Sequence, residues 1–255
     1  MVSLGVPYLV FSILYVILQH SSSSSVHDLY DWDSLVMLWW QPIGYLWFLY
    51  VLFFIFCLVY VMDGFKVPYL YQLVIYMALF VIAQLTPLPP VFSRTFTWCI
   101  TFYIGFLYKK YSQLSKRWIT CLSVIILIVS LTIQYLNVVN WYETNNLTFV
   151  TFFSKIASIF IFFTIFRMLQ DKIIGNYFTK YGPISLTIYV IHAPAASIFR
   201  VLLLKIGVSN IVIQIILGVI VVWYGCIFVD YLSNKFKPLD FIFYPNRYFK
   251  IGKLS

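Results

Sequence analysis

Charged residues are scarce in this sequence. Only 10% of its 255 residues are Asp, Glu, Lys or Arg, whereas soluble domains carry about 25%. Hydrophobic residues make up 62% of the chain, which excludes an ordinary soluble domain. The apolar runs are long and continuous rather than short and alternating, which excludes a β-barrel. The composition therefore predicts an all-α fold, a polytopic transmembrane helix bundle.

Cysteines are also few, and they lie far apart in the sequence, at Cys57, Cys99, Cys121 and Cys226. Each lies inside an apolar run, and no two have the spacing of metal ligands. We therefore predict buried, small hydrophobic side chains and no disulfide framework. Histidines and aspartates of the first loop fit no compact ligand pattern either, so we predict no metal site; these are His20, His27, Asp28, Asp31 and Asp33.

Long apolar runs locate the expected spans, because a spanning helix needs about 20 apolar residues. Eight runs qualify, at 2–19, 43–62, 68–85, 92–108, 118–137, 147–168, 184–204 and 208–231. Most Lys and Arg residues fall in alternate connections, on the side that holds both termini. Both termini are therefore predicted to be cytoplasmic.

The positions of these runs divide the chain into two predicted regions. We predict a transmembrane bundle over residues 1–234 and a basic, aromatic cytoplasmic tail over 235–255, held at the inner leaflet by anionic lipid. The net charge of +9 is explained by charges that set topology, so we expect the bilayer as a partner and no nucleic acid. A multi-pass protein of the plasma (inner) membrane is the predicted localisation.

A polar stripe marks the helix that follows Pro183. Ser185, Tyr189, His192 and Arg200 share one helical face on an otherwise apolar segment. His192 is expected near mid-bilayer, where a histidine must find a partner; it is either functional or bonded structurally to a neighbouring helix. Pro194, two residues later, frees a backbone carbonyl and marks a bend.

Two further residues have two interpretations each. Trp47 stands one turn inside the outer interface, where it could belong to the aromatic belt or form a pocket wall. Arg94 closely precedes the core of an apolar run, where it could be solvated or could face a cavity mouth.

Four sequence motifs together resemble the membrane acyltransferase-3 family, which O-acetylates cell-surface carbohydrates. Residues 185–192, Ser-Leu-x-Ile-Tyr-x-x-His, resemble its penultimate helix. Residues 44–49 resemble its His/Tyr-Leu-Trp-Phe-Leu helix start, and 104–107 followed by lysines resemble its Leu-Gly-Tyr-Leu helix end. Residues 6–8 resemble the start of its third helix. The motifs occur in the family's order across nearly the whole chain, and the most similar subgroup is fucose 4-O-acetylase-like.

This resemblance implies a reaction and roles for individual residues. Acetyl would pass from cytoplasmic acetyl-CoA, a donor substrate rather than a bound cofactor, to a hydroxyl of a cell-surface polysaccharide or lipid-linked sugar. His192 would be a supporting base or hydrogen-bonding group, and Tyr189 and Ser185 would orient the reactants. Trp47 would wall the pocket, while Arg94 and Arg200 would bind the acceptor.

One family feature has no match in this chain. The family's first helix carries a basic residue, ten intervening positions and then the histidine thought to be catalytic. The residue eleven positions before His20 is Leu9. We therefore expect the chain to lack the family's first two helices and its primary base. Two other functions stay open: a transporter or flippase for lipid-linked sugars, and an inactive membrane remnant.

Overall fold

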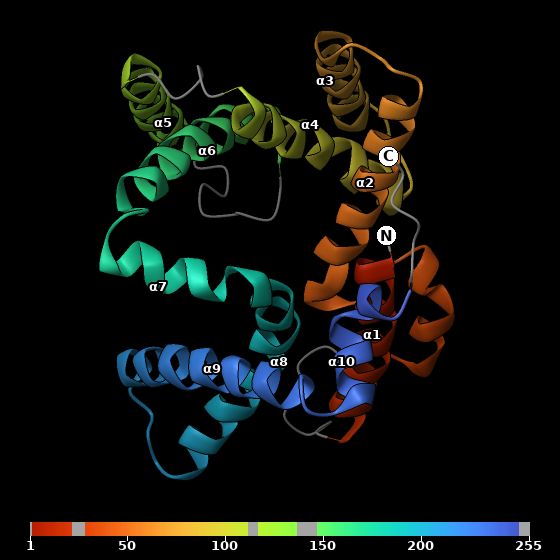
Figure 1. Ribbon diagram of the computed structural model, residues 1–255, viewed down its shortest axis with the longest axis vertical. Helices are drawn as coiled ribbons and strands as arrows, with labels where there is room; N and C mark the ends of the chain where they lie inside the picture. Colours follow the sequence, from red (N-terminus) through yellow and green to blue (C-terminus); the bar gives the residue numbers. More distant parts are fainter. Residues whose placement is uncertain (1, 22–28, 112–116, 137–146, 250–255) are drawn as a thin grey trace. The chain divides into compact units, whose positions relative to one another are not determined.

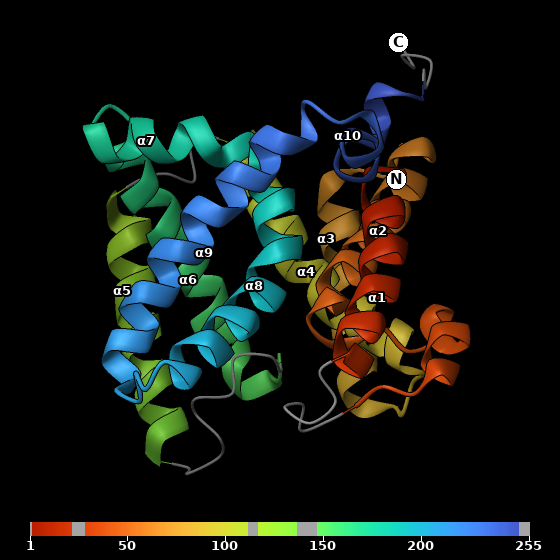
Figure 2. The same cartoon turned by 90° about the horizontal axis from the view of Figure 1, so that it is seen from below.

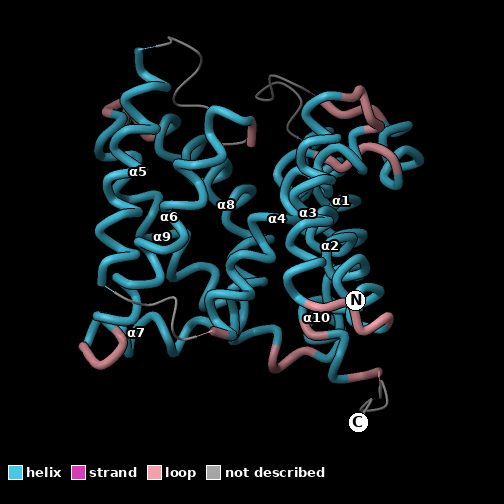
Figure 3. The backbone as a smooth tube through the Cα atoms, turned by 90° about the horizontal axis from the view of Figure 1, so that it is seen from above, coloured by secondary structure: helices cyan, strands magenta, loops and turns pink. Residues whose placement is uncertain are grey.

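The computed structural model describes residues 2–21, 29–111, 117–136 and 147–249. Over these ranges the chain is helical and contains no strand (Figure 3). This confirms the predicted all-α fold. Two stretches named in the sequence analysis lie outside the described residues: 22–28 with His27 and Asp28, and the end of the tail at 250–255.

Each of the eight predicted runs forms a long helix. In chain order the helices are α1 (Val2–Ser21), α2 (Trp47–Gly64), α3 (Tyr69–Leu85), α4 (Pro90–Lys110), α5 (Arg117–Leu136), α6 (Phe149–Leu169), α8 (Ser185–Lys205) and α9 (Ile211–Ser233). Within the described ranges, six helical segments are both long and apolar enough to cross a membrane. The apolar α3 is shorter, and α4 is not among the six. The protein is thus a multi-pass membrane protein; an eight-span count and cytoplasmic termini stay predictions.

Several short helices lie between the long ones. A 3₁₀ segment, η2 (Trp32–Trp39), occupies part of the predicted first loop, and η3 (Gly44–Leu46) leads into α2. Helix α7 (Ile173–Tyr181) and η5 (Gly182–Ile184) precede α8. The tail forms α10 (Lys237–Phe243) and η6 (Pro245–Arg247).

The chain divides into two compact units. The first comprises residues 1–53 and 180–255, and the second comprises residues 54–179. In the first unit α8 packs along α9, and α1 contacts α10 and η6 (Figure 2). In the second unit α3 pairs with α4, and α5 pairs with α6 (Figure 1). The first part of the tail is therefore packed against α1.

Polar side chains join the helices of the second unit. The buried Gln134 amide of α5 donates to the hydroxyl of Ser154 in α6 at 3.0 Å and to that of Ser130 at 3.1 Å. Lipid tails are as apolar as leucine, so such hydrogen bonds and close packing hold membrane helices together. Gln134 thus fixes α5 against α6 where apolar contact alone would be unspecific.

The cysteine prediction is correct in part. Cys99 and Cys226 are buried, and Cys57 is half-buried, but Cys121 is exposed on α5. A small side chain on the outer face of a membrane helix can contact lipid, so an apolar run does not by itself imply burial in protein. All four thiols are free.

The turn from α6 into α7 is so tight that it requires glycine. A Cβ atom added at Gly175 would lie 1.8 Å from the carbonyl oxygen of Leu169 and 2.6 Å from its carbonyl carbon. Both are backbone atoms, so no side-chain rotation can relieve the contact. Gly175 therefore allows α7 to fold back against the end of α6.

We expect Gly175→Ala to lower the free energy of unfolding by about 1–3 kcal/mol, the usual cost of overpacking. Gly218→Ala is the matched control, because Gly218 is also helical and has nothing within 4 Å of its added Cβ. The measurement is the thermal unfolding midpoint of each purified variant in detergent. Equal midpoints for the two variants would show that the α6–α7 turn is not as close as described.

Candidate functional site

Tyr45 is positioned by the glycine before it. Gly44 has φ +47°, a conformation that favours glycine. A Cβ there would also lie 3.2 Å from the ring of Tyr15 in α1. The Tyr15 and Tyr45 rings meet edge to face, with centroids 5.5 Å apart. Gly44 thus lets the chain turn closely past α1 and places the Tyr45 side chain against α8.

A proline in α8 creates the acceptor that Tyr45 binds. Pro194 has no backbone N–H, so the carbonyl of Val190, four residues earlier, loses its helical partner. The Tyr45 hydroxyl donates to this Val190 carbonyl at 2.6 Å. In return, the Tyr189 hydroxyl donates to the backbone carbonyl of Tyr45. This reciprocal pair of bonds joins η3 to α8.

His192 lies beside this pair, on the same helix. Its Nδ1 is 2.6 Å from the carbonyl oxygen of Tyr189 and 3.2 Å from that of Ile188. A carbonyl only accepts hydrogen bonds, so Nδ1 carries the proton in the neutral ring and Nε2 keeps its lone pair. Nε2 has no hydrogen-bond partner among the described residues. The imidazole is therefore oriented by its own helix, with one nitrogen left as a base.

Aromatic rings surround the imidazole. The ring centroids of Tyr45 and Tyr189 lie 5.8 Å and 5.7 Å from that of His192. Phe48 of α2 approaches Tyr189 with centroids 5.5 Å apart. We call Tyr15, Tyr45, Phe48, Tyr189 and His192 the tyrosine–histidine cluster. All five belong to the first unit.

The predicted polar stripe on α8 is brought together only in part. Tyr189 and His192 are half-buried and share Tyr45, whereas Ser185 and Arg200 are exposed. Trp47 packs edge-on against Phe48, and Phe48 in turn contacts Tyr189. Arg94 is exposed in the first turn of α4, in the second unit. Among the described residues, no group of three His, Cys, Asp or Glu could hold a metal ion.

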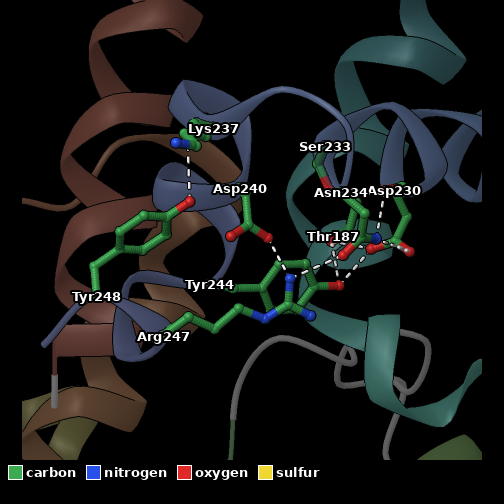
Figure 4. A network of polar contacts seen from close by, with 9 residues as sticks. All are labelled: Thr187, Asp230, Ser233, Asn234, Lys237, Asp240, Tyr244, Arg247 and Tyr248. Carbon is green, nitrogen blue, oxygen red and sulfur yellow. Dashed lines mark hydrogen bonds and ion pairs between the residues drawn. The ribbon is translucent and has the colours of Figure 1, made fainter. Parts of the chain in front are cut away.

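A second polar network, missed by the sequence analysis, holds the N-terminal end of α8 (Figure 4). Thr187 is fully buried, and its hydroxyl lies 3.5 Å from the Asp230 carboxylate and 3.4 Å from the Tyr244 hydroxyl. Tyr244 donates to the same carboxylate. Burial, together with this hydrogen bond, raises the pKa of Tyr244 to about 12. The network joins α8, the end of α9 and the tail.

An arginine of the tail completes this network. Arg247 forms an ion pair with Asp240 and donates to the Asn234 side-chain oxygen at 2.8 Å. Its guanidinium also lies over the Tyr244 ring, 4.2 Å from the centroid. The sequence signal for the network was Asp230, the single charged residue of α9. A lone acidic residue in an apolar helix needs partners, and these come from the tail.

The sequence was compared with protein families, curated proteins and solved structures. The sequence model of a family described as an acyltransferase domain matches residues 1–230, which is most of the chain. The match includes every residue of the tyrosine–histidine cluster. No curated protein and no solved structure matches the chain.

The bond from Tyr45 to Val190 is expected to matter only because Pro194 is present. Tyr45→Phe should lower stability by about 1 kcal/mol, the usual contribution of one hydrogen bond. Pro194→Ala restores an N–H to the helix, so Tyr45→Phe should have a smaller effect in that background. Thermal unfolding of the wild type, both single variants and the double variant measures the coupling. An identical effect of Tyr45→Phe in the two backgrounds would contradict this assignment.

Proposed function

The chain belongs to the membrane acyltransferase-3 family, and we propose that it transfers acetyl from acetyl-CoA to a hydroxyl of a cell-surface polysaccharide or lipid-linked sugar. Membership of this family and the membrane helices support a membrane acyltransferase. The observation that carries the proposal is the position of His192, whose Nδ1 lies 2.6 Å from the Tyr189 carbonyl oxygen, which leaves Nε2 for the acceptor hydroxyl.

The proposed chemistry is a direct acyl transfer. The acceptor hydroxyl attacks the thioester carbonyl, a C–O bond forms and the C–S bond breaks. His192 Nε2 takes the hydroxyl proton and then gives it to the departing thiolate, so that CoA leaves as a thiol. A positioned base of this kind contributes about 10²–10⁴-fold to a rate. The family resemblance implied a supporting role for His192; we propose that in this chain it is the base.

The cluster favours this role because it fixes the orientation of the imidazole ring. Its Nδ1 proton is held by two carbonyls of α8, which sets the tautomer and the ring orientation. The hydroxyls of Tyr45 and Tyr189 donate hydrogen bonds to backbone carbonyls, so these two tyrosines act as positioning residues. Arg200, in the same unit as His192, remains a proposed contact for the acceptor. The predicted topology implies that the acetyl donor enters from the cytoplasmic side and that the acceptor lies on the outer side.

The test measures transfer of label from radioactive acetyl-CoA to polysaccharide and sugar-lipid in membrane vesicles that contain the full chain. His192→Asn is expected to reduce base-labile incorporation by at least 100-fold. His20→Asn is the matched control, because His20 also places Nδ1 near a carbonyl of its own helix, at 3.0 Å from Val16, but lies outside the cluster. This control should retain wild-type activity.

Three results would overturn the proposal. Full activity in His192→Asn would remove His192 as the base. Wild-type vesicles that translocate a labelled sugar-lipid without acetylating it would identify a flippase. Vesicles with folded protein that neither transfer acetyl nor move the lipid would identify an inactive remnant.

A further inference from the structure

A cleft of about 660 Å³ lies within the second unit, at the ends of α4 and α6 beside α7. Its basic residues are Lys109 from the last turn of α4 and Arg167 from the last turn of α6. The tight turn at Gly175 brings α7 against the end of α6 and closes one side. Neither basic residue belongs to the tyrosine–histidine cluster.

A buried hydroxyl lies in the wall of this cleft without a partner. The Tyr108 side chain is only 8% exposed, and its ring stacks on Phe163 with centroids 4.8 Å apart. Its hydroxyl makes no hydrogen bond to any part of the chain that the structure describes. A buried polar group without a partner is costly, and a ligand atom can supply the missing bond.

The rest of the wall is apolar and opens outward. Phe166, Ile174 and Phe178 line the cleft, yet their side chains are 63%, 57% and 54% exposed. Exposed aromatic and aliphatic groups beside a spanning helix contact lipid chains. The basic residues stand at helix ends, where headgroups lie. The cleft therefore combines two cations and a hydroxyl donor with an apolar wall that continues into the lipid-facing surface.

We propose that this cleft binds an anionic phospholipid of the surrounding bilayer. The lipid phosphate lies against Lys109 and Arg167, the Tyr108 hydroxyl donates to a headgroup or ester oxygen, and an acyl chain follows Phe166 and Phe178. Basic pockets between membrane helices recognise anionic headgroups in this way. CoA also carries phosphates, but as a soluble donor it needs no wall open to lipid. The proposal is independent of the acyl-transfer reaction.

Native mass spectrometry of the full chain in detergent tests the site, with phosphatidylglycerol as the probe and phosphatidylcholine as the neutral comparison. The wild type is expected to retain phosphatidylglycerol preferentially. The double variant Lys109→Gln/Arg167→Gln should bind it about 30-fold more weakly, since each cation near a headgroup contributes about 1 kcal/mol. Tyr108→Phe, which keeps the ring stacked, should bind it more weakly than the wild type.

The matched control is the double variant Arg117→Gln/Lys172→Gln. These two residues belong to the same unit, are exposed and carry the same charge, but they do not line the cleft. The control should bind phosphatidylglycerol like the wild type. Equal weakening in both double variants would show diffuse attraction and overturn the proposal. Displacement of the lipid by CoA, with CoA binding lost in the Lys109/Arg167 variant, would assign the cleft to the nucleotide and also overturn it.

Discussion

A backbone carbonyl without a donor cannot be left inside a membrane, where no water is available to bond it. Pro194 creates such a carbonyl at Val190, in the second turn of α8, and the Tyr45 hydroxyl supplies the missing donor at 2.6 Å. The bond is specific, because η3 must place one tyrosine at one point along α8. Gly44, with its positive φ and its close approach to Tyr15, allows that placement. This hydrogen bond and the return bond from the Tyr189 hydroxyl to the Tyr45 carbonyl hold η3 beside His192.

The other contacts of α8 hold the same helix from its N-terminal end. Thr187 is buried and meets the Asp230 carboxylate and the Tyr244 hydroxyl, so α9 and the tail are joined to α8 three residues before Val190. Between these two points the Tyr189 carbonyl anchors His192. Because α8 is held at both positions, the His192 ring has little freedom to move, which is what the proposed role as a base requires. The tail is therefore part of the first unit as well as a basic segment suited to a lipid surface.

Helix positions could be predicted from apolar runs alone, because length and hydropathy decide which segments are stable in lipid. The contact between Tyr189 and His192 could be predicted as well, from their shared face on an apolar helix. Their partners could not, since Tyr45 and Phe48 are distant in sequence and resemble other aromatic residues of an aromatic-rich helix. The proline did indicate where a partner was needed, because a proline inside a helix leaves the backbone carbonyl four residues earlier without its hydrogen-bond donor. Ser185 and Arg200 lie on the predicted helical face but are exposed. Periodicity predicts which residues share a face of a helix, but it does not predict which parts of that face another helix covers.

Nitrogen NMR of His192 tests the central claim most directly. The sequence has three histidines, so replacing His20 and His27 with Asn leaves His192 as the single labelled ring of the 255-residue chain in detergent. In the neutral ring we expect the proton on Nδ1, directed at the Tyr189 carbonyl, and the lone pair on Nε2. A proton on Nε2 in the neutral ring would contradict the account, because His192 would then have no base available on that nitrogen.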